Sequence, residues 1–229
     1  MSMALGLPCR DGLVICADEQ ILMPGGNKSF EERISCVDLF GSVLVSSYAG
    51  PPELWREATD KIAHQLIGLQ GPEEEGDVCV TPHAIYETAD EVFTTMGRPA
   101  SLQMLMAVGG VFNSPELFVF ERGAMYRTTG FVCLGGGESS LVRFLADNLY
   151  SSSMALEAAK SVGIYLVAKA AQYMEKVGAP IDCIVVAGHQ PEWLGDAEIR
   201  EREAIMLARE KNFLPQILNP GTSGSGGRA

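Results

Sequence analysis

Basic residues are scarce in this chain of 229 residues, which has 17 Lys and Arg against 29 Asp and Glu and a net charge of −12. Nucleic acids and anionic membranes are bound by clustered Lys and Arg, so we expect neither as a partner. No apolar run approaches the roughly 20 residues of a membrane-spanning helix. The apolar N-terminus is too short for a secretory signal and lacks its basic segment, so we expect a cytoplasmic protein.

Patterns typical of metal sites and disulfide frameworks are also missing. The six cysteines include no Cys-x-x-Cys pair and no histidine near them at metal-ligand spacing. Most of them lie in apolar, strand-like runs, where a reduced thiol packs as a small hydrophobic side chain. The three histidines, His64, His83 and His189, are not spaced with an Asp and a Ser as in a Ser-His-Asp hydrolase. We therefore expect reduced cysteines, no metal and no cofactor.

What the chain does have is enough apolar sequence for one substantial core. Hydrophobic residues make up 47% of it, and the mean hydropathy is +0.12. A chain of this length and composition is typical of a compact globular domain. We expect one domain over residues 1–211 and a flexible tail over residues 212–229, which is rich in Gly and Ser from residue 219.

Hydrophobic periodicity and turn residues predict separate runs of strands and helices. Strands are expected at residues 4–9, 13–17, 33–38, 42–47, 102–108, 116–120, 124–128, 131–134 and 181–187. Helices are expected at residues 51–70, 81–96, 140–150, 153–177 and 196–210. Segregated runs of this kind predict an α+β fold with antiparallel sheets rather than alternating βαβ units.

The candidate functional site lies in the N-terminal hairpin. Two apolar runs flank Arg10-Asp11-Gly12, and an Asp-Gly pair between such runs is a strong hairpin signal. The second run ends in Asp18, where we expect the buried strand to reach the surface. The hairpin therefore returns a carboxylate close to the chain terminus. Ser2 becomes the first residue when Met1 is removed, which is usual before a small residue.

This opening resembles that of proteasome β-type subunits and their bacterial relatives, which are N-terminal nucleophile hydrolases. In that family a terminal Thr, Ser or Cys begins the first strand, a glycine follows, and the second strand ends in Ala-Asp. Ser2, Gly6 and Ala17-Asp18 occupy these positions. The similarity covers nearly the whole ordered chain and includes the Gly-rich segment 134–138 and the final strand from Ile181-Asp182.

The resemblance implies a four-layer αββα sandwich of two antiparallel sheets, each flanked by a helix pair. The predicted order of strands and helices agrees with it. The resemblance also implies a threonine-type peptidase or amidohydrolase with Ser2 as nucleophile, Asp18 and Arg33 beside it, and the Ser47 N–H as oxyanion donor. It further implies a ring-forming homo-oligomer that acts on peptides or proteins, with an ATPase or regulatory ring as an open candidate partner.

Two departures from the family affect the proton path. Arg33 stands where the family has a lysine, and arginine supplies positive charge but no proton relay. Peptidase members also carry an Asp and a Ser in the turn before the final strand. Residues 174–178 of this chain offer Glu175 as their one acid and contain no serine.

Two function classes therefore remain open. The first is an N-terminal serine hydrolase, in which the freed α-amine of Ser2, with a reference pKa of about 7.7–8.0, acts as base. In this class Asp18 orients the cation of Arg33, which keeps the amine neutral. The second is a non-catalytic, proteasome-like structural subunit with a degenerate site. Retention of Met1, measured by intact mass, would exclude the first class.

Overall fold

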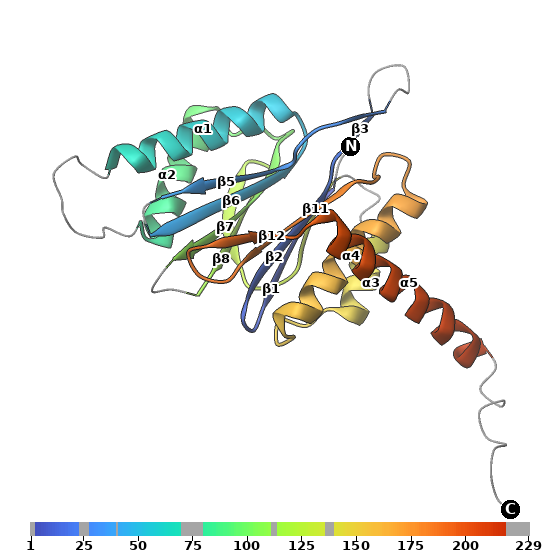
Figure 1. Ribbon diagram of the computed structural model, residues 1–229. Coiled ribbons are helices and arrows are strands. Elements are labelled where there is room, and N and C mark those ends of the chain that lie inside the picture. The colour runs from blue at the N-terminus through green and yellow to red at the C-terminus, as the bar shows by residue number, and fades with distance from the viewer. Residues whose placement is uncertain are drawn as a thin grey trace, which may run out of the picture.

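Figure 1 shows the computed structural model, which describes residues 3–22, 28–39, 41–69, 80–110, 114–135 and 140–218. Most of the described strands belong to two five-stranded antiparallel sheets. The expected tail lies outside the described residues from residue 219 onward.

The first sheet has the strand order β10-β1-β2-β11-β12 and contains the N-terminal hairpin. Its strands are β1 (Ala4–Cys9), β2 (Gly12–Asp18), β10 (Val132–Leu134), β11 (Ile181–Val186) and β12 (Pro191–Trp193). Cys9 pairs with Gly12 across the two-residue turn of Arg10 and Asp11, so the hairpin predicted from the Asp-Gly pair is confirmed. β2 lies at the centre of this sheet, between β1 and β11.

The second sheet has the strand order β5-β6-β7-β8-β9. Its strands are β5 (Ile34–Asp38), β6 (Ser42–Ala49), β7 (Gln103–Gly110), β8 (Glu116–Glu121) and β9 (Ala124–Thr128). A two-stranded pair, β3 (Gln20–Leu22) with β4 (Lys28–Phe30), lies in a segment for which the sequence predicted no strand. These strands are three residues each, too short to produce a readable alternation.

Five helices are described: α1 (Pro52–Leu69), α2 (Pro82–Thr95), α3 (Ser140–Leu149), α4 (Leu156–Tyr173) and α5 (Asp196–Leu218). The hydroxyl of Thr81 accepts the Ala84 N–H and caps α2, with Pro82 in its first turn. The apolar face of α2 points into the core, with Ile85, Ala89, Val92 and Phe93 buried. None of the described helices is both long and apolar enough to cross a bilayer.

The core consists of three clusters of buried side chains. One joins the first sheet to α3, α4 and the start of α5, and another joins the second sheet to α1 and α2. The third contains side chains of both sheets and lies between them. Figure 1 shows the helix pairs α1–α2 and α3–α4 on opposite sides of the sheets. At Gly109 of β7 a Cβ atom would lie 2.0 Å from the carbonyl oxygen of Gly188, so here β7 approaches the backbone of the segment that joins β11 to β12.

Several element boundaries differ from the prediction. The sequence predicted no strand at 191–193, and α4 is shorter at both ends than the predicted 153–177. The backbone of α5 continues to Leu218, beyond the predicted end at residue 210. Cys9, Cys16, Cys36, Cys133 and Cys183 are free thiols, as expected; Cys79 lies outside the described residues.

Candidate active site

Asp18 lies at the end of β2 and is fully buried, so the expectation that it reaches the surface is wrong. Its Oδ1 accepts the Met3 N–H at 2.7 Å, and its Oδ2 accepts the Gly178 N–H at 3.2 Å. The covering residues come from the start of β1 and from the turn between α4 and β11. The Ala-Asp pattern at the end of a strand could not predict this burial, because Gly178, which covers Asp18, is 160 positions away along the chain.

Burial raises the pKa of the Asp18 carboxyl from an ordinary value of 3.8 to about 6. The Met3 N–H bond, the positive charge of Arg33 and the Gly178 N–H bond act in the opposite direction. Desolvation is the larger effect. At pH 8 the carboxyl is therefore ionised inside the protein, with two backbone donors to hold it.

Arg33, directly before β5, is 4% exposed and supplies the buried cation near Asp18. Its guanidinium donates from Nη2 to the Gln20 carbonyl oxygen at 3.0 Å and lies over the Tyr48 ring, 5.1 Å from the ring centroid. Within the described part of the chain, Arg33 forms no ion pair with Asp18, and its Nε has no hydrogen-bond partner. Arg33 and Asp18 thus interact electrostatically over a distance and not through an ion pair. The expectation that Asp18 orients the Arg33 cation by direct contact is therefore wrong.

The turn before β11, where the sequence lacks the family's Asp and Ser, contributes backbone groups instead. The Gln20 amide donates from Nε2 to the Glu175 carbonyl oxygen at 3.0 Å. At Gly178 a Cβ atom would lie 2.2 Å from the Gln20 Oε1, so glycine permits this close contact. Sequence reasoning missed both Gln20 and Gly178. The only available signal was a polar residue two positions after Asp18, which is common at strand ends.

Ser47, expected as the oxyanion donor, lies inside β6 rather than at its end. It is paired with Ile34 of β5 and with Leu105 of β7. Because a central strand directs its N–H groups into the ladders on either side, this N–H is poorly placed to meet a substrate. β6 continues to Ala49, and the turn into α1 is made by Gly50, whose φ is +126°. The expectation for Ser47 was misplaced because the sequence pattern ended the strand two residues early.

Ser2, the expected nucleophile, lies outside the described residues. The described chain begins at Met3, whose side chain is 2% exposed and whose N–H is bound to Asp18. Of the predicted site residues, Asp18 and Arg33 thus lie near each other at the start of β1. Ser47 lies within the second sheet.

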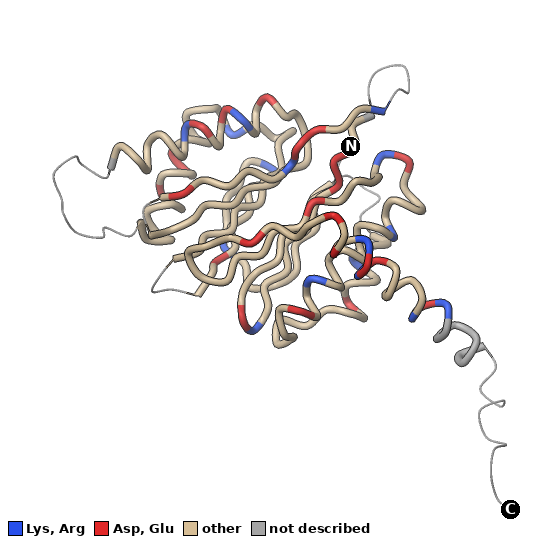
Figure 2. The backbone as a smooth tube through the Cα atoms, viewed as in Figure 1, with Lys and Arg blue, Asp and Glu red and all other residues tan. Residues whose placement is uncertain are grey.

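Acidic residues gather where the ends of β2, β5 and β11 meet (Figure 2). Burial, together with the negative charge and hydrogen bond of Glu19 and the charge of Glu32, raises the pKa of Asp182 to about 7. The negative charges of Glu19 and Glu32 near Asp182 are therefore not fully balanced by neighbouring cations. No group of three His, Cys, Asp or Glu side chains within the described ranges is arranged to hold a metal ion.

Comparison with known proteins identifies the fold through structure alone. No family model matches the sequence, and no curated protein sequence matches it significantly. Among solved structures, an Anbu (Gly-1) mutant from Hyphomicrobium sp. strain MC1 is 15% identical, with a TM-score of 0.76 over 94% of this chain and 97% of that one. Anbu (ancestral beta-subunit) from Yersinia bercovieri is 14% identical, with a TM-score of 0.72 over 93% and 97%.

A helical assembly of the Anbu complex from Pseudomonas aeruginosa is also similar, with 16% identity and a TM-score of 0.70 over 93% of this chain and 96% of that one. All of these chains are matched over nearly their full length, although their identities are low. The likeness therefore shows a proteasome-like fold of helices and antiparallel sheets.

Proposed function

We propose that the chain is an N-terminal nucleophile hydrolase that cleaves peptide or amide bonds with Ser2 after removal of Met1. One observation carries the proposal. The buried carboxylate of Asp18 binds the backbone N–H of Met3, the residue next to Ser2, while the Arg33 cation acts on the same carboxyl. The proteasome-like fold, shared with solved structures at low sequence identity, is compatible with the proposal but does not identify the catalytic residues.

In the proposed reaction, the Ser2 Oγ attacks the carbonyl carbon of the amide and its proton passes to the Ser2 α-amine. The resulting ammonium returns that proton to the leaving nitrogen, and the amine product departs from an acyl-enzyme ester. Water then hydrolyses the ester by the same path and restores Ser2. A terminal residue is suited to this chemistry because nucleophile and base belong to one residue.

Arg33 and Asp18 have different parts in this proposal. The guanidinium keeps its charge and relays no proton, so its field keeps the α-amine neutral and favours the negative charge that develops on the attacking oxygen. Asp18 anchors the start of β1 through the Met3 N–H, which places Ser2 relative to the site. The α-amine is consequently the base in this chain.

For the oxyanion we propose the N–H of Gly50 in place of that of Ser47. A donor must point out of the sheet toward the substrate, and Gly50 lies where β6 gives way to α1. A side chain is excluded there, since a Cβ atom would lie 2.4 Å from the Ser101 carbonyl oxygen.

The alternative of a non-catalytic structural subunit gains no support from the geometry of the site. A buried carboxylate and a buried guanidinium that form no ion pair with each other are costly to retain in a core. In a protein without chemistry at this site, apolar residues would serve the core better. The retained polar groups therefore support the catalytic proposal.

We further propose the four-layer αββα sandwich as the arrangement of this single domain, because one cluster lies between the sheets and one beneath each helix pair. We also propose a homo-oligomer, in a ring of six or more subunits. Large apolar side chains are exposed on α3 and α4, with Phe144 at 65% and Tyr173 at 70%. A similar fold occurs in the helical Anbu assembly. Among the residues that the structure describes, none identifies an ATPase or regulatory ring as partner.

The test of the catalytic proposal combines an intact mass with activity and labelling. We expect Met1 to be absent, short peptide amides to be hydrolysed, and an electrophile that bridges hydroxyl and amine to label Ser2. The Ser2→Ala variant keeps the amine but lacks the attacking oxygen, so hydrolysis and labelling should vanish. A stability change below about 0.5 kcal/mol is expected for such a small change at the chain end. Wild-type protein that lacks Met1 and shows neither activity nor labelling would refute the proposal.

A further inference from the structure

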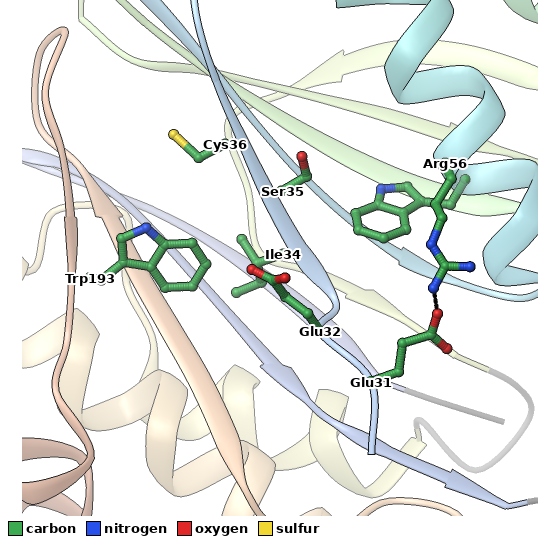
Figure 3. Close-up of a pocket in the computed structure, with 8 residues that line it drawn as sticks. Glu31, Glu32, Ile34, Ser35, Cys36, Arg56 and Trp193 are labelled. Atoms are coloured by element: carbon green, nitrogen blue, oxygen red, sulfur yellow. Dashed lines mark ion pairs between the residues drawn. The ribbon is translucent and has the colours of Figure 1, made fainter. Parts of the chain in front are cut away.

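A groove lies where the two sheets end on the same side of the molecule (Figure 3). β5 is the last strand of one sheet, and β12 is the last strand of the other. The cavity between them has a volume of about 460 Å³. Its lining residues are Glu31, Glu32, Ile34, Ser35, Cys36, Trp55, Arg56 and Trp193.

The walls of this groove combine an aromatic face with a negative charge. Trp193 of β12 is 43% exposed, although an indole normally packs against protein. Glu31 forms an ion pair with Arg56, whereas Glu32 is exposed and has no ion pair among the described residues. In Figure 3 the Glu32 carboxylate and the Trp193 ring both lie at the groove. An aromatic face beside a carboxylate is the chemistry that recognises a cation.

The surroundings of Glu32 do not neutralise it. The charge of Glu32 is one of the causes that raise the pKa of Asp182, after burial and Glu19, so its negative field reaches the neighbouring strand. The cation on the Trp193 side, Lys160, is already held by Glu157 at 2.9 Å and lies 3.8 Å from Glu192. A cationic ligand in the groove would therefore meet the negative charge of Glu32, which no ion pair among the described residues neutralises.

The floor of the groove can bind an extended chain. In the described part of the chain β5 pairs only with β6, from Ile34↔Ser47 to Asp38↔Val43. In an antiparallel strand every second residue directs its N–H and C=O away from its partner, so residues 34–36 of β5, which line the groove, direct backbone groups away from β6. An extended peptide can add to such an edge, with main-chain bonds for affinity and side-chain contacts for specificity.

We propose that this groove binds an extended peptide segment that pairs with β5 and carries a Lys or Arg side chain between Trp193 and Glu32. The binding goes beyond the amide hydrolysis proposed above and does not need Ser2. It is therefore tested in the Ser2→Ala variant as well as in the wild type. A peptide that binds without being cleaved would separate the two proposals.

Two natural probes report on the groove. Cys36 lines it and is exposed, so its alkylation by iodoacetamide can be followed by peptide mass spectrometry. The chain has two tryptophans, and only Trp193 is accessible to a soluble quencher because Trp55 is 5% exposed. We would add acetyl-Ala-Val-Lys-Val-Ala-amide to the Ser2→Ala protein, with peptides that carry Glu or norleucine in place of Lys as comparison.

The Lys peptide should slow Cys36 alkylation and shield Trp193 from acrylamide, and the Glu peptide should do neither. Glu32→Gln and Trp193→Leu should each weaken binding of the Lys peptide by about twofold to fivefold, as expected for an exposed charge pair or cation–π contact. Glu32→Gln should also remove the preference for Lys over norleucine. Matched controls are Glu91→Gln on α2 and Tyr126→Leu on β9, which should bind like the parent.

Three results would overturn the proposal. The first is equal protection of Cys36 by the Lys and Glu peptides, and the second is no protection at millimolar peptide. The third is protection that grows with protein concentration in the absence of peptide, which would make a second copy of the chain the occupant. Near-UV circular dichroism of each variant shows that a loss of binding does not come from a loss of fold.

Discussion

Replacing Asp18 by Asn tests a fully buried charge at the candidate site. The pKa of Asp18 rises from 3.8 to about 6, mainly because the carboxyl is buried. A shift of about 2 units corresponds to about 3 kcal/mol, since one pKa unit is 1.36 kcal/mol. Because the folded-state pKa is the higher one, the stabilisation by the proton is fully present below pH 3.8 and is lost as the pH rises through 6. Ionised Asp18 therefore destabilises the folded state at neutral pH.

Asn cannot ionise, so the variant lacks this part of the pH dependence. Its Oδ1 can still accept the Met3 N–H, but the Gly178 N–H loses its acceptor. An unsatisfied buried donor costs about 1–3 kcal/mol. We expect Asp18→Asn to be less stable than wild type at pH 4 by that amount, and about equal to it, or more stable, at pH 8.

The assay is urea unfolding of both proteins at intervals from pH 4 to pH 8. The observable is the difference between the two stability curves, because Asp182, with a pKa of about 7, titrates in both proteins. That difference should change by about 2.5 kcal/mol across the range, slightly less than the full shift of about 3 kcal/mol, because the carboxyl of the unfolded state is already partly ionised at pH 4. Asp147→Asn on the exposed face of α3 is the matched control and should run parallel to wild type. If the Asp18→Asn curve is also parallel, the carboxyl is not desolvated as the structure indicates.

Further predictions concern the site, the assembly and the packing of the sheets. Arg33→Ala should abolish peptide-amide hydrolysis while Arg33→Lys keeps or raises it, because lysine restores the proton relay; an unchanged rate in the alanine variant would make Arg33 structural. Sedimentation at micromolar concentration should show six or more subunits, and a monomer would contradict the proposed ring. Gly109→Ala should lower the free energy of unfolding by about 3 kcal/mol or more, because the added Cβ meets the Gly188 carbonyl rather than a movable side chain. Gly68→Ala, in open space on α1, should instead raise it by up to about 1 kcal/mol.

The N-terminal hairpin and the capped helix were predictable because their signals are local. The Asp-Gly pair sets the turn between β1 and β2, and Thr81-Pro82 begins α2 whatever the rest of the chain does. The segregated order of strands and helices favoured an α+β fold for the same reason. Boundaries were less predictable, since the apolar run of β6 does not show where its ladder with β7 ends. Because of that error, the expected oxyanion donor, Ser47, lies inside β6 and not at its end.

The candidate site depended on contacts that no local pattern contains. Ala-Asp at the end of β2 predicted that Asp18 matters, but the burial that raises its pKa depends on distant cover such as the turn at Gly178, which the register of β2 with β11 brings beside it. The sequence likewise indicated an acidic protein without showing that Glu32 and Trp193 share a groove. The hydrophobic periodicity of a strand or a helix is visible within a few consecutive residues, so the sequence alone determines where these elements form. Desolvation and charge pairing depend on which distant segments meet, and only the tertiary structure decides that.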